Sequence, residues 1–184
     1  TPLDAGTGQV QLMVNAASGP EIEAVEILQA IANARINSAN PIRTPRFLTQ
    51  VVVTDFHADV RMFFGLRETL GDAIPDIVNE ECAGFDWDGS NFRAISSDGG
   101  GAGVSTNLAT PSEGPMVQLE VIVLSQVQVE FYVNGVLVAT HDTAAGIPTV
   151  NIDWQHLLNN YTGGGGAGIV YVTVANGGVQ QCPA

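Results

Sequence analysis

The chain contains no lysine, and its six basic residues are outnumbered by 19 acidic ones. The resulting formal charge of -13 repels phosphate backbones and anionic lipid headgroups, so we expect binding neither to nucleic acid nor to a membrane surface. No apolar run reaches the roughly 18 residues that a membrane-spanning helix needs, so we expect no transmembrane segment.

Cysteine is scarce as well. Cys82 and Cys182 are the only two, and their wide separation excludes a metal site of recognisable cysteine spacing. Two alternatives remain open. The pair forms one disulfide bridge in an oxidising compartment, or Cys82 and Cys182 are a buried thiol and a free one, which is the alternative we favour.

Common catalytic motifs are also missing. The sequence has no G-x-S-x-G and no P-loop, and its glycine-rich stretches at 99–103 and 163–168 lack the strand-then-helix context of a dinucleotide site. The histidines are scattered and have no serine or cysteine partner motif, so we expect ordinary hydrogen-bonded or surface roles for His57, His141 and His156.

The clearest structural pattern spans residues 127–142. Apolar and polar residues alternate before Asn134-Gly135, and residues 136–141 run back after it, which predicts two strands joined by a type I′ turn. A two-residue turn places these pairs opposite one another: Val133 and Val136, Phe131 and Val138, Val129 and Thr140.

The rest of the chain indicates a β protein. We expect strands at 9–15, 47–56, 59–66, 82–87, 91–96, 104–108, 116–124 and 167–175, with weak alternation at 149–154 and a helical turn at 155–161. Residues 21–36 fit either a strand, which we favour, or a helix. Short strands with glycine-rich turns predict an all-β, two-sheet antiparallel sandwich or jelly roll. We expect one domain over 1–184, with an N-terminal arm at 1–8 and a loose tail at 176–184.

Several stretches together resemble a known family. They are Phe64-Gly65-Leu66, Ala83-Gly84-Phe85-Asp86-Trp87-Asp88-Gly89, Arg93-Ala94-Ile95-Ser96, and the hairpin Val129-Glu130-Phe131-Tyr132-Val133-Asn134-Gly135 with its return strand. Over about 47–174 the chain resembles the concanavalin A-like (laminin G-like) jelly roll, as found in tailed-phage virion proteins. The resemblance implies a fold that hosts lectins, glycanases and structural modules alike.

Acidic residues near position 88 suggest two kinds of site. Glycanases of this fold need paired carboxylates on alternate positions of a strand. Asp86 and Asp88 come nearest to that pattern, but Asp88 falls in a turn and no third acid follows, so we expect no catalysis there. Oxygen ligands from a loop also suit Ca²⁺, and the candidate ligands are Asp86, Asp88, Asn91 and Asp98.

A sugar site needs an exposed aromatic ring that can stack on a pyranose face. The candidates are Trp87, Trp154 and Tyr161, although most such rings are core or interface residues.

These observations lead to a sequence-based expectation for function. We expect a non-enzymatic structural module, a phage virion surface or capsid decoration protein that binds its own subunits or capsid and tail proteins. The outer face of the hairpin is the expected interaction face, through Tyr132, Leu137 and Ala139. Two alternatives stay open: a carbohydrate-binding, lectin-like domain that binds glycans, with or without Ca²⁺, and an extracellular filament or surface-layer subunit.

Overall fold

The computed structural model describes residues 10–15, 25–28, 43–68, 74–124, 128–149, 153–160 and 169–183. Side chains are described for 46–68, 74–124, 128–149 and 155–158, and for Val172 and Val174. Within these ranges, none of the helical structure is long or apolar enough to cross a membrane. The expected arm at 1–8 lies outside the described residues.

The described chain consists almost entirely of β-strands. They are β1 (Val10–Asn15), β2 (Val25–Leu28), β3 (Arg43–Val53), β4 (Val60–Arg67), β5 (Glu81–Trp87), β6 (Phe92–Asp98), β7 (Val104–Leu108), β8 (Met116–Leu124), β9 (Gln128–Val133), β10 (Val136–His141), β11 (Asp153–Asn160) and β12 (Ile169–Pro183). A single turn of 3-10 helix, η1 (Ala144–Gly146), follows β10. In the ambiguous stretch 21–36, β2 confirms the strand alternative for Val25–Leu28.

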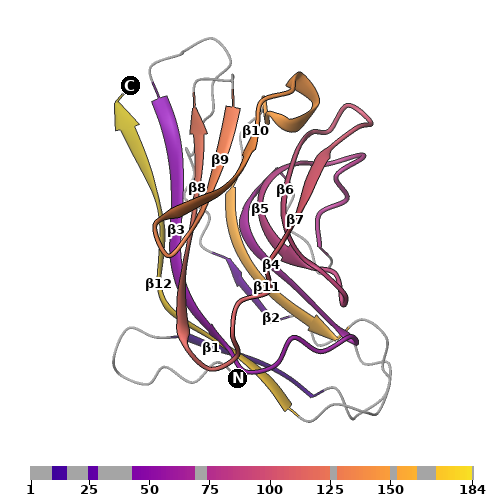
Figure 1. The fold of residues 1–184 in the computed structure, drawn as a ribbon, viewed down its shortest axis with the longest axis vertical. Coiled ribbons are helices and arrows are strands. Elements are labelled where there is room, and N and C mark those ends of the chain that lie inside the picture. The colour runs from indigo at the N-terminus through magenta and orange to yellow at the C-terminus, as the bar shows by residue number, and fades with distance from the viewer. Residues whose placement is uncertain are drawn as a thin grey trace.

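The strands form two six-stranded sheets that pack face to face (Figure 1). Sheet A has the order β1-β12-β3-β8-β9-β10, and sheet B has the order β2-β11-β4-β5-β6-β7. Neighbouring strands run antiparallel in both sheets, which confirms the predicted sandwich. In Figure 1, β4, β5 and β6 curve so that their hollow side faces away from sheet A. We call this side the concave face of sheet B.

Aromatic side chains dominate the core between the sheets. Phe85 of β5 stacks on Phe92 of β6 with ring centroids 5.7 Å apart, and it meets Phe131 of β9 edge-on at 5.6 Å. All three rings are at most 1% exposed. Because full burial of a phenylalanine stabilises a fold by about 1.5–3 kcal/mol, these contacts hold sheet A firmly to sheet B.

A smaller apolar cluster lies on the concave face. Phe63, Cys82, Ile95 and Leu157 are fully buried there, because Ile74 and Ile77 of the segment before β5 pack over them. Cys82 is a free thiol, so it is not bridged to Cys182, and burial raises its pKa. This confirms the buried-thiol alternative for Cys82. The apolar cluster covers one part of the concave face and leaves the end near the β5–β6 turn to polar residues.

The sequence-based prediction is confirmed for the start of β12, but it is wrong for most of β11 and for the end of β12. Residues 155–161 were expected to form a helical turn, but β11 is a strand between β2 and β4. The expected loose tail is also wrong over 176–183, because this part of β12 pairs with β3 from Gln50 to Arg43, after a bulge between Val174 and Asn176.

The β9–β10 hairpin differs from the prediction by one residue. Its turn is confirmed, since Asn134 and Gly135 have φ of 52° and 75°, the positive values of a type I′ turn. However, a bulge between Leu137 and Ala139 shifts the register, so Phe131 faces Ala139 rather than Val138. Val129 likewise faces His141 rather than Thr140. The extra residue of the bulge explains the shift.

Candidate functional site

The polar end of the concave face is built around a buried carboxylate. The β5–β6 register places Asp86 opposite Arg93. Asp86 is 0% exposed, and the Arg93 guanidinium binds it with two groups: Nε donates to Oδ1 at 2.9 Å, and Nη2 donates to Oδ2. Such a two-pronged pair fixes both side chains in orientation as well as in position.

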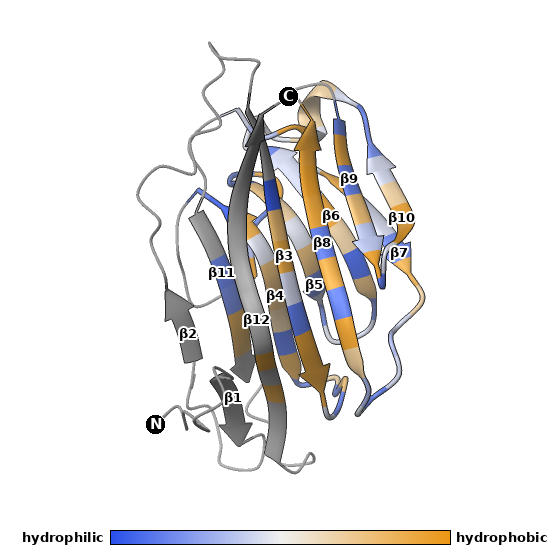
Figure 2. Cartoon of the chain, turned by 90° about the vertical axis from the view of Figure 1, so that its left-hand side faces the viewer, coloured by the Kyte–Doolittle hydropathy of each residue, from blue (hydrophilic) through white to orange (hydrophobic). Residues whose placement is uncertain are grey.

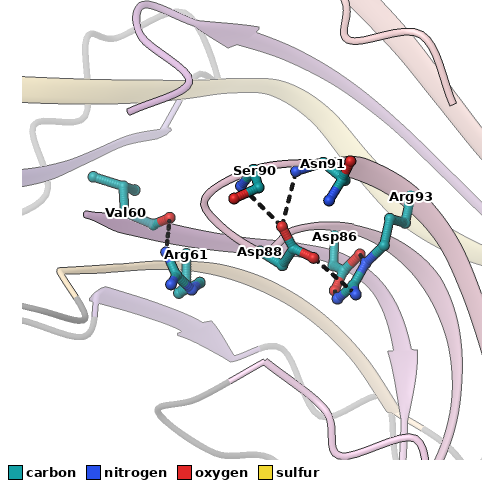
Figure 3. A network of polar contacts seen from close by, with 7 residues as sticks. All are labelled: Val60, Arg61, Asp86, Asp88, Ser90, Asn91 and Arg93. Atoms are coloured by element: carbon teal, nitrogen blue, oxygen red, sulfur yellow. Dashed lines mark hydrogen bonds and ion pairs between the residues drawn. The ribbon is translucent and has the colours of Figure 1, made fainter. Parts of the chain in front are cut away.

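Asp88 completes the carboxylate pair from the β5–β6 turn (Figure 3). Its Oδ2 lies 2.8 Å from Nη1 of Arg93. Its Oδ1 accepts backbone hydrogen bonds from Ser90 at 2.9 Å and from Asn91 at 2.8 Å. The same side chain therefore closes the turn and contacts the guanidinium nitrogen of Arg93 that Asp86 does not use.

Arg61 of β4 borders the same turn. Its Nη1 donates to the carbonyl oxygens of Ala58 at 2.8 Å and Val60 at 3.0 Å. A Cβ on Gly89 would lie 2.1 Å from that nitrogen, so only glycine leaves room for the guanidinium. We call Arg61, Asp86, Asp88 and Arg93 the Asp86 cluster.

An exposed amide extends the cluster toward the edge of sheet B. Asn107 of β7 pairs with Arg93 in the β6–β7 register, and register partners in a ladder share a face of the sheet. Asn107 is exposed. The concave face therefore presents a guanidinium, a carboxylate and an amide side by side.

The two carboxylates titrate differently. Burial raises the pKa of Asp86, and the hydrogen bonds and charge of Arg93 offset this only in part. For Asp88, partial burial acts in the same upward direction, but the backbone donors of Asn91 and Ser90 and the charge of Arg93 together lower the pKa. The hydrogen bond to Asp86 raises the pKa of Arg93, although burial of the guanidinium acts in the opposite direction.

Three of the four candidate calcium ligands, Asp86, Asp88 and Asn91, lie around one turn, and Asp98 lies apart. Asp86 and Asp88 are held by Arg93, whose positive charge occupies the place of a cation between them. Asp98 pairs with Glu81 at the far end of the hairpin from the turn that contains Asn91. In the part of the chain described, no three His, Cys, Asp or Glu side chains form a group that could hold a metal ion.

Of the aromatic candidates for sugar stacking, only the side chain of Trp87 lies in the described part of the structure, and it is buried. Trp87 is only 6% exposed, and it packs edge-on against Phe56 while its Nε1 donates to the carbonyl of His57 at 2.9 Å. It is therefore a core residue and not an exposed platform. The Trp154 side chain and the whole of Tyr161 lie outside what the structure describes, so those two stay predictions.

The expected interaction face on the hairpin is only partly formed. Leu137 is 49% exposed, and half-buried Tyr132 lies opposite it and donates its hydroxyl to Glu130 at 2.7 Å. Ala139, however, packs against the core, because the bulge turns it inward beside Phe131. Val136 and Val138 are 64% and 36% exposed instead, which gives the hydrophobic start of β10 seen in Figure 2.

Two histidines are buried and hydrogen-bonded inside the sandwich, as expected. His141 lies between Ser96 Oγ at 2.7 Å and Thr106 Oγ1 at 3.0 Å, and His156 lies 2.7 Å from Thr49 Oγ1. Burial lowers the pKa of His141 to about 4, against the opposing charge of Asp142, and that of His156 to about 3.

Sequence reasoning missed the arginines of the cluster. The predicted hairpin, with residues 88–90 as its turn, pairs Asp86 with Phe92. The observed register is shifted by one residue and pairs Asp86 with Arg93. The roles of Arg61 and Asn107 depend on neighbouring strands, and no local signal marks them.

Comparison with known proteins shows the fold but no family. No family model matches the chain, and no curated protein matches it. Among solved structures, it resembles alginate lyase A1-II′ of polysaccharide lyase family 7, with 11% identity, a TM-score of 0.62, and coverage of 100% of this chain and 84% of the lyase. Alginate lyase AlyC3 in complex with dimannuronate gives 12% identity and a TM-score of 0.62, with 98% and 77% coverage.

A receptor-binding toxin has a similar fold. Botulinum neurotoxin type C, whose cell entry depends on interaction with two ganglioside molecules, gives 10% identity and a TM-score of 0.61, with coverage of 97% of this chain and 40% of the toxin chain. The chain thus has the concanavalin A-like jelly-roll fold that its sequence predicted.

These likenesses correct two expectations. The prediction of a virion surface module is wrong, because the similar structures are polysaccharide lyases and toxin domains and provide no link to a virion. The prediction that the chain is not an enzyme is wrong as well, since the fold is shared with family 7 lyases. The glycan-binding alternative is compatible with these structures.

Proposed function

We propose that the chain binds carbohydrate on the concave face of sheet B, at the Asp86 cluster and Asn107. The observation that carries this proposal is the rigid array of carboxylate, guanidinium and amide groups held on an outer sheet face. Sugar hydroxyls are recognised by a few precisely oriented polar groups of these kinds. Ordering these side chains on binding loses little conformational entropy, because Arg93 and Asp88 are already fixed by their own contacts.

Two further points support the proposal. Similar folds have been solved with an oligosaccharide, as in the dimannuronate complex of alginate lyase AlyC3. In addition, the pKa of Asp86 is shifted by burial and by a specific charge partner, and groups of this kind cluster at functional sites. Trp154 and Tyr161 remain candidates for ring stacking in this proposal.

A glycan array followed by NMR titration of the purified chain tests the proposal. We expect hits whose chemical-shift changes centre on residues 88–93 and 105–107. Replacing Asn107 by alanine should lower the affinity about fivefold, the effect of one lost hydrogen bond of about 1 kcal/mol.

Leu137→Ser is the matched control, because Leu137 is exposed on sheet A and lies away from the cluster. It should leave the affinity unchanged. A blank array, or shift changes confined to another face of the molecule, would contradict the proposal.

A further inference from the structure

The charge balance of the Asp86 cluster bears on which glycans it accepts. A guanidinium recognises a sugar carboxylate through the same two-pronged geometry that it uses for aspartate. In Arg93 these donor groups are already engaged: Nε and Nη2 contact Asp86, and Nη1 contacts Asp88. A uronic acid would therefore arrive beside Arg93 as a third carboxylate.

The surroundings of the cluster add to this effect. The chain carries 19 acidic residues against six basic ones. Arg67 lies 2.5 Å from Glu80, and Arg46 lies 2.5 Å from Glu120. In Arg61, the other guanidinium of the cluster, Nη1 already donates to the carbonyl oxygens of Ala58 and Val60. An approaching polyanion meets a negative field, which salt screens over a Debye length of about 8 Å at physiological ionic strength.

An uncharged sugar is not repelled by this negative field. The Asp88 carboxylate is partly exposed and can accept a hydroxyl hydrogen bond through Oδ2, and the amide of Asn107 can both donate and accept. Hydroxyl groups can donate a further hydrogen bond to these acceptors without adding charge.

We infer that this site selects uncharged glycans and rejects uronic acids, in contrast to what the dimannuronate complex of the similar lyase shows for that protein. The inference rests on the proposed function and specifies its ligand class. Asp88 is the selectivity-determining residue, because its carboxylate is the second negative charge in contact with the Arg93 guanidinium.

A matched pair of disaccharides tests the inference. One is dimannuronate, and the other is its neutral counterpart with a hydroxymethyl group in place of each carboxylate. At low salt, the neutral disaccharide should bind at least about tenfold more tightly, the scale of a like-charge penalty. Raising the salt concentration should narrow this difference by improving the binding of dimannuronate.

Asp88→Asn provides the second arm. The amide keeps an acceptor for the Ser90 and Asn91 backbone donors and frees part of Arg93. We expect the affinity ratio of dimannuronate to the neutral disaccharide to rise about tenfold, since one opposing charge is gone. Asp142→Asn removes the same charge at an exposed position after β10, and the ratio should stay as it is in the unaltered chain.

The outcomes separate the two proposals. Equal or tighter binding of dimannuronate by the unaltered chain, or array hits confined to glycans with acidic sugars, overturns the selectivity and leaves glycan binding in place. An Asp88→Asn ratio no different from that of Asp142→Asn removes Asp88 from the role given to it. If neither disaccharide binds and the glycan array is blank, the proposed function fails first.

Discussion

At the scale of single residues, the stability of the concave face depends on one ion pair. Asp86 is 0% exposed, and its charge is compensated by Arg93. A buried pair of this kind contributes little net stability relative to apolar residues, but removing one member leaves a buried charge without its partner.

Arg93→Met should therefore destabilise the fold by about 3 kcal/mol. Urea unfolding followed by tryptophan fluorescence measures the change in the free energy of unfolding. The double variant Asp86→Leu with Arg93→Met removes both charges, and it should recover most of the loss. Equal destabilisation in the single and double variants would show that packing, and not charge, dominates at this position.

His156 makes stability depend on pH. The ring is fully buried between Phe47 and Phe64, at centroid distances of 5.6 and 6.1 Å. In the unfolded chain the histidine binds a proton below about pH 6.5. In the folded chain burial lowers its pKa to about 3, so the unfolded state binds more protons between these two values.

Stability should consequently fall as the pH drops from about 6.5 toward 3, by about 1.4 kcal/mol per pH unit from this residue. His156→Gln keeps a hydrogen-bonding group near Thr49 and should flatten the decline. The half-exposed His57, replaced in the same way, is the matched control. Identical pH profiles for the two variants would argue against a role for His156.

At the scale of elements, β4 and β5 approach closely through a pair of glycines. Gly65 lies opposite Gly84 in the register, and a Cβ on Gly65 would come within 2.5 Å of the Gly84 Cα and 2.6 Å of the Ala83 oxygen. These contacts are with backbone atoms, which cannot move aside as a flexible side chain can.

Gly65→Ala should accordingly cost about 2 kcal/mol of stability through overpacking. Gly100→Ala is the control, because its nearest contacts are the carboxylate atoms of Asp98 at 3.0–3.3 Å, which can rotate away. Thermal unfolding of both variants measures the difference. A Gly65 variant as stable as the Gly100 variant would mean that the strands can separate without loss.

The elements also show what the sequence could predict. Strands such as β8 and β9 were predictable because one face of each contacts the core and the other faces solvent, which produces alternation. β11 was not, since Gln155, His156, Leu157 and Leu158 are all buried and no alternation survives. In β12, Asn176-Gly177-Gly178 looks like a turn, yet it follows a bulge and continues the strand.

The candidate site was predictable only in part. Asp86 and Asp88 stand out by composition, but their partner is set by the register of a hairpin. The concave face itself depends on which strands become neighbours across the whole of sheet B.

At the scale of the whole molecule, β12 joins the two parts of sheet A. It pairs with β1 on one side and with β3 on the other. The stretch from Asn176 to Pro183 covers the edge of β3 from Gln50 to Arg43. An uncovered strand edge is a template for pairing with other chains.

Ending the chain after Ala175 should therefore expose β3 and cause self-association. Size-exclusion chromatography and light scattering over a range of protein concentrations would detect it, with the full chain as the reference. A truncated chain that stayed monomeric and unfolded at the same urea concentration would show that this half of β12 is dispensable.

The strand order has a consequence for biosynthesis. β11 and β12 are the last two of the strands that the structure describes, yet each inserts between earlier ones: β11 between β2 and β4, and β12 between β1 and β3. On the ribosome, β1 and β2 must wait for partners translated more than a hundred residues later. Such long-range pairing folds slowly and leaves the nascent chain with open edges. We therefore expect its yield in cells to depend on chaperones that hold the early strands apart until translation passes β12.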